Sequence, residues 1–224
     1  MTLVALTGLT RRLGDRDVVA SADLAIAPGE TVALMGPSGC GKTTLLQMIG
    51  LIDRPDSGSV ALGGCDAWAA SDSTRAALRL RSIGFVFQHS NLIEHLSVRD
   101  NVALPAWRAT GSRKAALAEA DRLLGRFGLA ERSTARASVL SIGEAQRAAI
   151  ARAMINRPRL IIADEPTGSL DAVAAQAVIE ALLGGGRPPA GERPAVLIAT
   201  HDPDVAARAD RTVRMRDGRL GTAA

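Results

Sequence analysis

The sequence predicts an α/β fold built around a largely parallel sheet, and three observations lead to this prediction. Short apolar stretches typical of buried strands alternate with stretches of helical spacing, which is the pattern of a parallel sheet covered by helices. A glycine-rich loop at residues 36–43 lies between one such strand and one such helix. From Ser97 to Phe127 the chain is rich in Ala and carries leucines at roughly helical intervals, so we expect a mostly helical insertion there.

Apolar runs place the other expected elements along the chain. Strands are expected at 3–6, 18–26, 31–35, 83–87, 160–163 and 195–199. Helices are expected at 42–49, from 143 to about 155 and from about 171 onward. With 224 residues, this order favours one compact domain with a subdomain over two unrelated domains.

Composition excludes several classes of protein. The hydrophobic share of 47% supports a sizeable core, but no apolar run approaches the roughly 18 residues that a membrane helix needs. The first ten residues lack the pattern of a signal peptide, so we expect a cytoplasmic location, with Cys40 and Cys65 as reduced thiols. The net charge of +4 comes from arginines scattered among acidic residues. We expect no nucleic-acid partner, because such sites cluster basic residues and interleave aromatic ones.

The glycine-rich loop has the pattern of a phosphate-binding site. It reads Gly36, Pro37, Ser38, Gly39, Cys40, Gly41, Lys42 and Thr43. Its glycines allow successive backbone N–H groups to face a phosphate, and the start of the following helix adds a favourable potential for an anion. Lys42 is expected to neutralise the β- and γ-phosphates of a nucleotide, and Thr43 to offer its hydroxyl to Mg²⁺.

Two adjacent carboxylates, Asp164 and Glu165, directly follow the apolar strand at 160–163. Ligands bind at the C-terminal ends of strands in open α/β sheets. Asp164 is expected to bind Mg²⁺ directly or through water, and Glu165 to orient or deprotonate an attacking water. Together with the phosphate loop, this pair predicts a nucleotide-hydrolysing site.

Four shorter matches in a fixed order complete a resemblance to the ATP-binding cassette ATPases over nearly the whole chain. The family's glutamine loop, signature, Ser-Leu-Asp loop and switch histidine have counterparts at Gln88, Leu140–Glu144, Ser169–Asp171 and His201. The resemblance implies a P-loop NTPase cassette with a RecA-like mixed-sheet core, an antiparallel β subdomain and an inserted α-helical subdomain. It assigns residues 1–88 and 157–224 to the core with the β subdomain, and approximately 89–156 to the helical subdomain.

The resemblance also implies roles for individual residues. It makes Glu165, His201 and Gln88 catalytic. It assigns the binding of Mg²⁺ to Thr43, Gln88 and Asp164. It assigns ATP to the loop from Gly36 to Thr43, and further to Thr44, Leu13, Ser141, Gly143 and Glu144.

Two partners follow from the same resemblance. A second copy of the chain, or a paralogous ATPase, would form a head-to-tail dimer in which each ATP lies between one subunit's phosphate loop and the other's signature. Gly84–Gln88 and Asp100–Pro105 look like the lipoprotein-releasing, macrolide-exporting and cell-division branch of the family. The chain would then power a membrane permease of the export or extraction type. It would touch this permease through residues 89–95, on the inner face of the cell membrane.

Three positions depart from the family pattern, and one of them, Ala145 in place of a Gln, carries little weight. Ile142 stands where the signature has its first glycine, and this β-branched residue predicts slower hydrolysis with binding retained. Leu13 stands where the family stacks an aromatic residue on adenine, and the missing π surface predicts weaker discrimination among purine nucleotides. Two other functions stay open, a non-transport ATPase of this family and a regulatory module that binds nucleotide without turnover.

Overall fold

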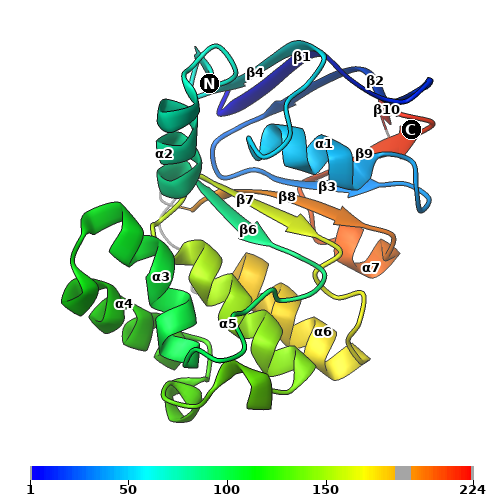
Figure 1. Cartoon of the computed structure of the whole chain (residues 1–224). Helices are drawn as coiled ribbons and strands as arrows, with labels where there is room; N and C mark the ends of the chain where they lie inside the picture. Colours follow the sequence, from blue (N-terminus) through cyan, green and yellow to red (C-terminus); the bar gives the residue numbers. More distant parts are fainter. Residues whose placement is uncertain (1, 185–192, 223–224) are drawn as a thin grey trace. The chain divides into compact units, whose positions relative to one another are not determined.

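The computed structural model describes residues 2–184 and 193–222 of the chain (Figure 1). The chain divides into two compact units, one formed by Met1–Arg79 with Pro188–Ala224 and the other by Leu80–Arg187. We refer to them as the first and the second unit. Both contain strands and helices, in agreement with the predicted α/β fold.

The first unit contains an antiparallel sheet. Its strands follow the order β2 (Arg16–Ile26), β1 (Val4–Leu13), β4 (Ser57–Leu62) and β5 (Cys65–Asp66). β1 and β2 form a long hairpin in which Leu13 pairs with Arg16 (Figure 1). Buried and exposed residues alternate over much of both strands, as expected for an antiparallel sheet with one face on the core.

The first unit also contains parallel strands, one of which, β3, leads into the glycine-rich loop. β3 (Thr31–Met35) pairs in parallel with β8 (Ala195–Thr200) and with β9 (Arg211–Arg216), and β10 (Arg219–Thr222) is antiparallel to β9. All six residues of β8 are buried, the pattern of a strand inside a parallel sheet. Helices α1 (Lys42–Ile49) and α7 (Pro203–Ala206) both contact β8. α2 (Asp72–Ser82) follows the antiparallel sheet along the chain.

The second unit combines a parallel pair of strands with a set of helices. Its strands are β6 (Ile83–Val86) and β7 (Leu160–Asp164). Its α-helices are α3 (Val98–Thr110), α4 (Arg113–Arg126), α5 (Ile142–Met154) and α6 (Ala172–Ile179), and a π-helical turn, η3, follows at Glu180–Gly184. Short 3-10 helices η1 (Ala130–Arg132) and η2 (Ala137–Val139) precede α5. Within the described residues, no helix has both the length and the apolar composition that a membrane crossing requires.

Polar caps fix where α3, α4, α5 and α6 begin. In each case a side chain at the N-cap accepts a hydrogen bond from a backbone N–H of the first turn, and these caps are Ser97, Ser112, Ser141 and Asp171. Such caps satisfy N–H groups that have no partner within the helix. Two of the four, Ser141 and Asp171, belong to the motifs singled out in the sequence.

Most of the predicted elements are confirmed. The strands expected at 31–35, 83–87, 160–163 and 195–199 and the helix expected at 42–49 agree with the structure to within one residue at each end. The helical insertion contains α3 and α4. The strand expected at 3–6 is longer than predicted, because β1 continues to Leu13.

Several elements were not predicted from the sequence, for identifiable physical reasons. α2 has no buried residue and, apart from Leu78 and Leu80, carries no large apolar side chain, so no apolar run marks it in the sequence. In β9 only Val213 and Met215 are buried, between exposed arginines, so its apolar signal is short. β4 and β5 are short strands of the antiparallel sheet and were likewise missed.

Gly84 in β6 has no room for a side chain. A β-carbon there would come within 2.3 Å of the carbonyl oxygen of Ala153 in α5. Gly84→Ala is therefore expected to lower the free energy of unfolding by about 1–3 kcal/mol, because the backbone would have to shift. Urea denaturation of the purified chain measures this change.

Gly125→Ala in α4 is the control for that measurement. A β-carbon at Gly125 meets nothing within 4 Å, so this exchange should raise the free energy of unfolding by about 0.5–1 kcal/mol. Equal stability of Gly84→Ala and the parent would contradict the close packing of β6 on α5.

Candidate functional site

The glycine-rich loop of the first unit runs from β3 to α1, and close packing shapes it. A β-carbon on Gly36 would lie 2.3 Å from the carbonyl oxygen of Met215, and one on Gly41 would lie 2.2 Å from that of Val18. Gly41 also has a φ of 107°, a conformation that residues with a side chain rarely adopt. The loop therefore keeps its path only if these two positions are glycine.

Lys42 and the start of α1 lie at the centre of this loop. The Lys42 ammonium donates hydrogen bonds to the carbonyl oxygens of Gly36 at 2.7 Å and Pro37 at 3.2 Å, and the residue is 8% exposed. No side chain caps the N-terminus of α1. A positive charge and the N–H groups of an uncapped first turn together suit an anion.

The turn between β9 and β10 supports the same loop. The backbone N–H of Gly218 donates to the carbonyl oxygen of Cys40 at 3.2 Å. Cys40 is 5% exposed, as expected for a structural thiol packed inside the loop. Met215 and Gly218 lie against the loop although nothing in the local sequence pattern links residues so distant in the chain.

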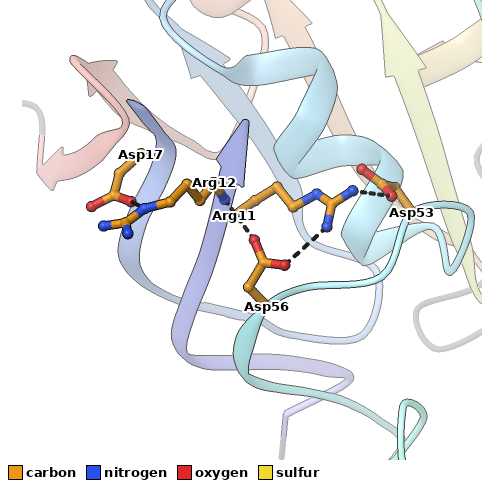
Figure 2. Close-up of polar contacts among 5 residues, drawn as sticks. All are labelled: Arg11, Arg12, Asp17, Asp53 and Asp56. Carbon is orange, nitrogen blue, oxygen red and sulfur yellow. Dashed lines mark hydrogen bonds and ion pairs between the residues drawn. The ribbon is translucent and has the colours of Figure 1, made fainter. Parts of the chain in front are cut away.

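Leu13 ends β1, and ion pairs fix the strand beside it. Figure 2 shows Arg11 reaching two carboxylates, Asp53 and Asp56, each at 3.1 Å. The backbone N–H of Arg12 donates to Asp56 at 2.7 Å, and this hydrogen bond is the main reason that the pKa of Asp56 lies below its usual value.

On the other side of the same strand end, the Arg12 guanidinium pairs with Asp17 of β2 at 2.9 Å (Figure 2). Leu13 itself is 54% exposed. An aliphatic side chain is thus presented to solvent at the end of a well-anchored strand. His201, also exposed, directly follows β8 in the first unit.

In the second unit, the predicted carboxylates lie at the end of β7. Asp164 is the last residue of the strand, and both Asp164 and Glu165 are half-buried. Glu165 has a φ of 47°, in the left-handed region. Its carbonyl oxygen accepts a hydrogen bond from the N–H of Gly168 at 3.1 Å, which closes a tight turn. A strained backbone of this kind persists only where the surroundings enforce it and is frequent at functional sites.

Gln88 comes close to that turn. A β-carbon on Gly168 would lie 3.4 Å from Nε2 of Gln88 and 3.7 Å from Cβ of Glu165. The structure therefore brings together, within the second unit, a glutamine and a glutamate whose sequence positions differ by more than seventy residues. The sequence motifs predicted both residues, and the structure adds their common position beside Gly168.

The signature residues form the start of α5. The hydroxyl of Ser141 accepts from the N–H of Glu144 at 3.3 Å, and the carboxylate of Glu144 accepts from the N–H of Ser141 at 2.9 Å, a reciprocal capping box. The second bond is the largest cause of the lowered pKa of Glu144, and Arg132 also donates to this carboxylate at 3.0 Å.

Next to this cap, Gly143 and Ile142 have opposite surroundings. Gly143 is buried, and a β-carbon there would approach Cβ of Ala174 in α6 to 3.2 Å. Ile142 is 64% exposed at the first position of α5. The α5 start is therefore packed on one side against α6 and presents an apolar side chain to solvent.

Sequence comparison assigns the chain to a family. A family model described as ABC transporter matches residues 19–168. The chain is 48% identical over 204 residues to the lipoprotein-releasing system ATP-binding protein LolD 1 of Rhodospirillum rubrum, with 91% of this chain and 89% of that protein covered. It is 44% identical over 222 residues to the LolD 2 protein of Caulobacter vibrioides, with 97% and 96% covered.

Solved structures agree with this assignment. An ATP-binding cassette solved as a dimer in a post-hydrolysis state with ADP and Pi bound has a TM-score of 0.86 and 32% identity, and 98% of each chain is covered. The cbiO1 protein of Clostridium perfringens, part of an ABC transporter complex, has a TM-score of 0.85 and 27% identity, with 98% of this chain and 87% of that one covered. The predicted cassette fold is thus confirmed, and the chain belongs to the ABC transporter family as one of its ATP-binding cassettes.

Proposed function

We propose that this chain is the ATP-hydrolysing subunit of a transporter that releases lipoproteins, working as a dimer bound to a membrane permease. The observation that carries the proposal is the phosphate loop. Its Gly36 and Gly41 have no room for side chains, the Lys42 ammonium bonds to the loop, and no side chain caps the start of α1. The names of the relatives from Rhodospirillum and Caulobacter support the lipoprotein substrate.

ATP fits the residues of the phosphate loop. Gly36 and Gly41 lie close against other backbone segments, as a curled loop requires, and the backbone N–H groups between Gly36 and Thr44, apart from Pro37, would contact the phosphates. The Lys42 ammonium would add a positive charge beside the phosphates. Leu13 would cover one face of the adenine, since an exposed leucine at this strand end offers an apolar surface. With no aromatic ring there, discrimination between ATP and GTP would be weak.

Mg²⁺ would be held by Thr43, Gln88 and Asp164. A hydroxyl, a carboxamide and a carboxylate are the hard oxygen donors that this ion prefers. When bound, the ion would neutralise charge on the β- and γ-phosphates.

Glu165 is the residue proposed to activate water. Its carboxylate would accept a proton at Oε as the water oxygen bonds to the γ-phosphorus and the bond to the bridging oxygen of ADP breaks. His201 would hold the γ-phosphate and the water. Gln88 lies beside the turn that follows Glu165, so it would report the state of the attacking water to the loop at residues 89–95.

A second copy of the chain, or a paralogous ATPase, would complete each site. Ser141, Gly143 and Glu144 begin α5 with an ordered capping box, and the N-terminus of this helix would meet the γ-phosphate bound by the partner. The dimeric state of the cassette solved with ADP and Pi supports this arrangement. ATP would close the dimer and hydrolysis would let it open.

The membrane permease is the second partner, and residues 89–95 are its proposed contact. The chain would lie against the inner face of the cell membrane through this subunit. The division of the cassette into a core at 1–88 and 157–224 and a helical subdomain at 89–156 remains part of this proposal. No nucleic-acid partner is proposed.

Replacing the proposed base gives the most direct test of hydrolysis. Glu165→Gln is expected to lower kcat for ATP by roughly 100-fold or more, because an amide cannot accept the proton. Binding of ATP should persist. Steady-state phosphate release and calorimetric titration measure the two quantities.

Glu131→Gln in η1 is the matched control for that test, because it removes an exposed carboxylate of the same unit. Its kcat should equal that of the parent. If Glu165→Gln hydrolyses ATP at the parental rate, or if the parent shows no turnover, the chain is a nucleotide-binding module instead of an ATPase.

The exposed Ile142 predicts a slowed enzyme. Ile142→Gly removes a β-branched side chain from the helix start that would face the γ-phosphate, so kcat should rise several-fold while KM for ATP changes little. Val139→Gly, at a position of similar exposure (65%) outside the signature, should leave kcat unchanged. An Ile142→Gly chain no faster than the parent at saturating ATP would refute the idea.

A further inference from the structure

The loop that follows β6 is held by a half-buried cationic side chain that the proposed chemistry does not use. Arg152 lies in the last turn of α5, and its two terminal nitrogens donate to the carbonyl oxygens of Ser90 and Asn91, both at 2.6 Å. Burial lowers the pKa of the Arg152 guanidinium. A planar guanidinium can hold two acceptors at once in a fixed geometry, so Arg152 ties two successive peptide groups of the loop to α5.

A second side chain of α5 holds the same loop on the other side of Gln88. Gln146 is 2% exposed, and its Nε2 donates to the carbonyl oxygen of Phe87 at 2.8 Å. That carbonyl belongs to the peptide that leads into Gln88. The loop is therefore attached to one helix both just before and just after the glutamine proposed to meet the metal and the water.

The far end of the loop is anchored to α3. Asn101 is 1% exposed and its side chain makes hydrogen bonds to both the N–H and the carbonyl oxygen of Ile93, at 2.7 and 2.9 Å. These bonds fix the end of the segment but leave its middle, at Ser90 and Asn91, dependent on Arg152. Asn91 also has a φ of 48°, a conformation that needs local support in a residue with a side chain.

α5 connects this loop to the signature. The helix begins at the Ser141 cap and ends at Met154, so Ser141 and Arg152 lie at its two ends. An α-helix transmits displacement along its axis because its hydrogen-bonded turns are stiff. A change at the Ser141 end would therefore reach the carbonyl groups that Arg152 holds.

We propose that Arg152 is a positioning residue that sets the Gln88 side chain through the Ser90 and Asn91 carbonyls and couples it to the signature end of α5. The inference rests on the proposed function, in which Gln88 meets the attacking water. Arg152 does not touch ATP in this account. It acts on the rate of hydrolysis through Gln88.

Three variants test the proposal in the full chain, with steady-state ATP hydrolysis and thermal unfolding as readouts. Arg152→Met keeps the length of the stem but has no donor, and kcat should fall on the order of 10- to 100-fold with KM for ATP nearly unchanged. Arg152→Lys keeps the charge but not the planar fork, so its kcat should lie between those of Arg152→Met and the parent. Arg157→Met, with a side chain 84% exposed just beyond α5, is the control and should match the parent.

A double-mutant cycle separates positioning from simple loss of structure. Gln88→Ala lowers kcat by itself, and Arg152→Lys should lower it no further in the Gln88→Ala background, because both act on the same side chain. A purely structural role would instead multiply the two losses. Such multiplication overturns the proposal, and so does parental kcat in Arg152→Lys or in Gln88→Ala.

Failure of this inference is distinguishable from failure of the proposed function. Glu165→Gln reports the ATPase itself and does not involve Arg152. If Glu165→Gln abolishes turnover while the two losses at Gln88 and Arg152 multiply, the chain is an ATPase in which Arg152 has no positioning role.

Discussion

The close packing of two glycines, Gly36 and Gly41, is the constraint on which the phosphate loop depends. Backbone carbonyl groups of Met215 and Val18 occupy the space that side chains would need. The curled path then brings Lys42 onto the loop carbonyls and leaves the start of α1 without a side-chain cap. The Lys42 ammonium and the N–H groups at the start of α1 together suit an anion, which is the physical basis of the proposed ATP contacts.

The second unit has a comparable constraint around α5. A single helix begins with the capping box of Ser141 and Glu144, packs at Ala153 against Gly84, and holds the loop after β6 through Gln146 and Arg152. Of the residues with proposed roles, Ser141, Gly143 and Glu144 begin this helix, and the loop that contains Gln88 and the proposed permease contact is held by it. In the proposed function, α5 is therefore the single element that joins the signature to the loop after β6.

Local patterns explain what the sequence could predict. The apolar runs of β3, β7 and β8 and the glycines before Lys42 identify the core strands and the phosphate loop without any long-range information. Gly36 packs on Met215, and Arg152 donates a hydrogen bond to the carbonyl oxygen of Ser90. Both contacts join residues far apart in sequence, so no local pattern reveals them. An arginine among the alanines of α5 was the available signal for the latter. The catalytic and ligand roles of individual residues remain predictions.

In the proposed function, one chain supplies only half of each ATP site, and ATP joins two copies of the chain. Light scattering after gel filtration of the Glu165→Gln chain, in the presence of Mg²⁺ with either ATP or ADP, tests this most directly. We expect twice the mass of the chain with ATP and the mass of a single chain with ADP. A single-chain mass at saturating ATP, with binding confirmed by titration, would contradict it.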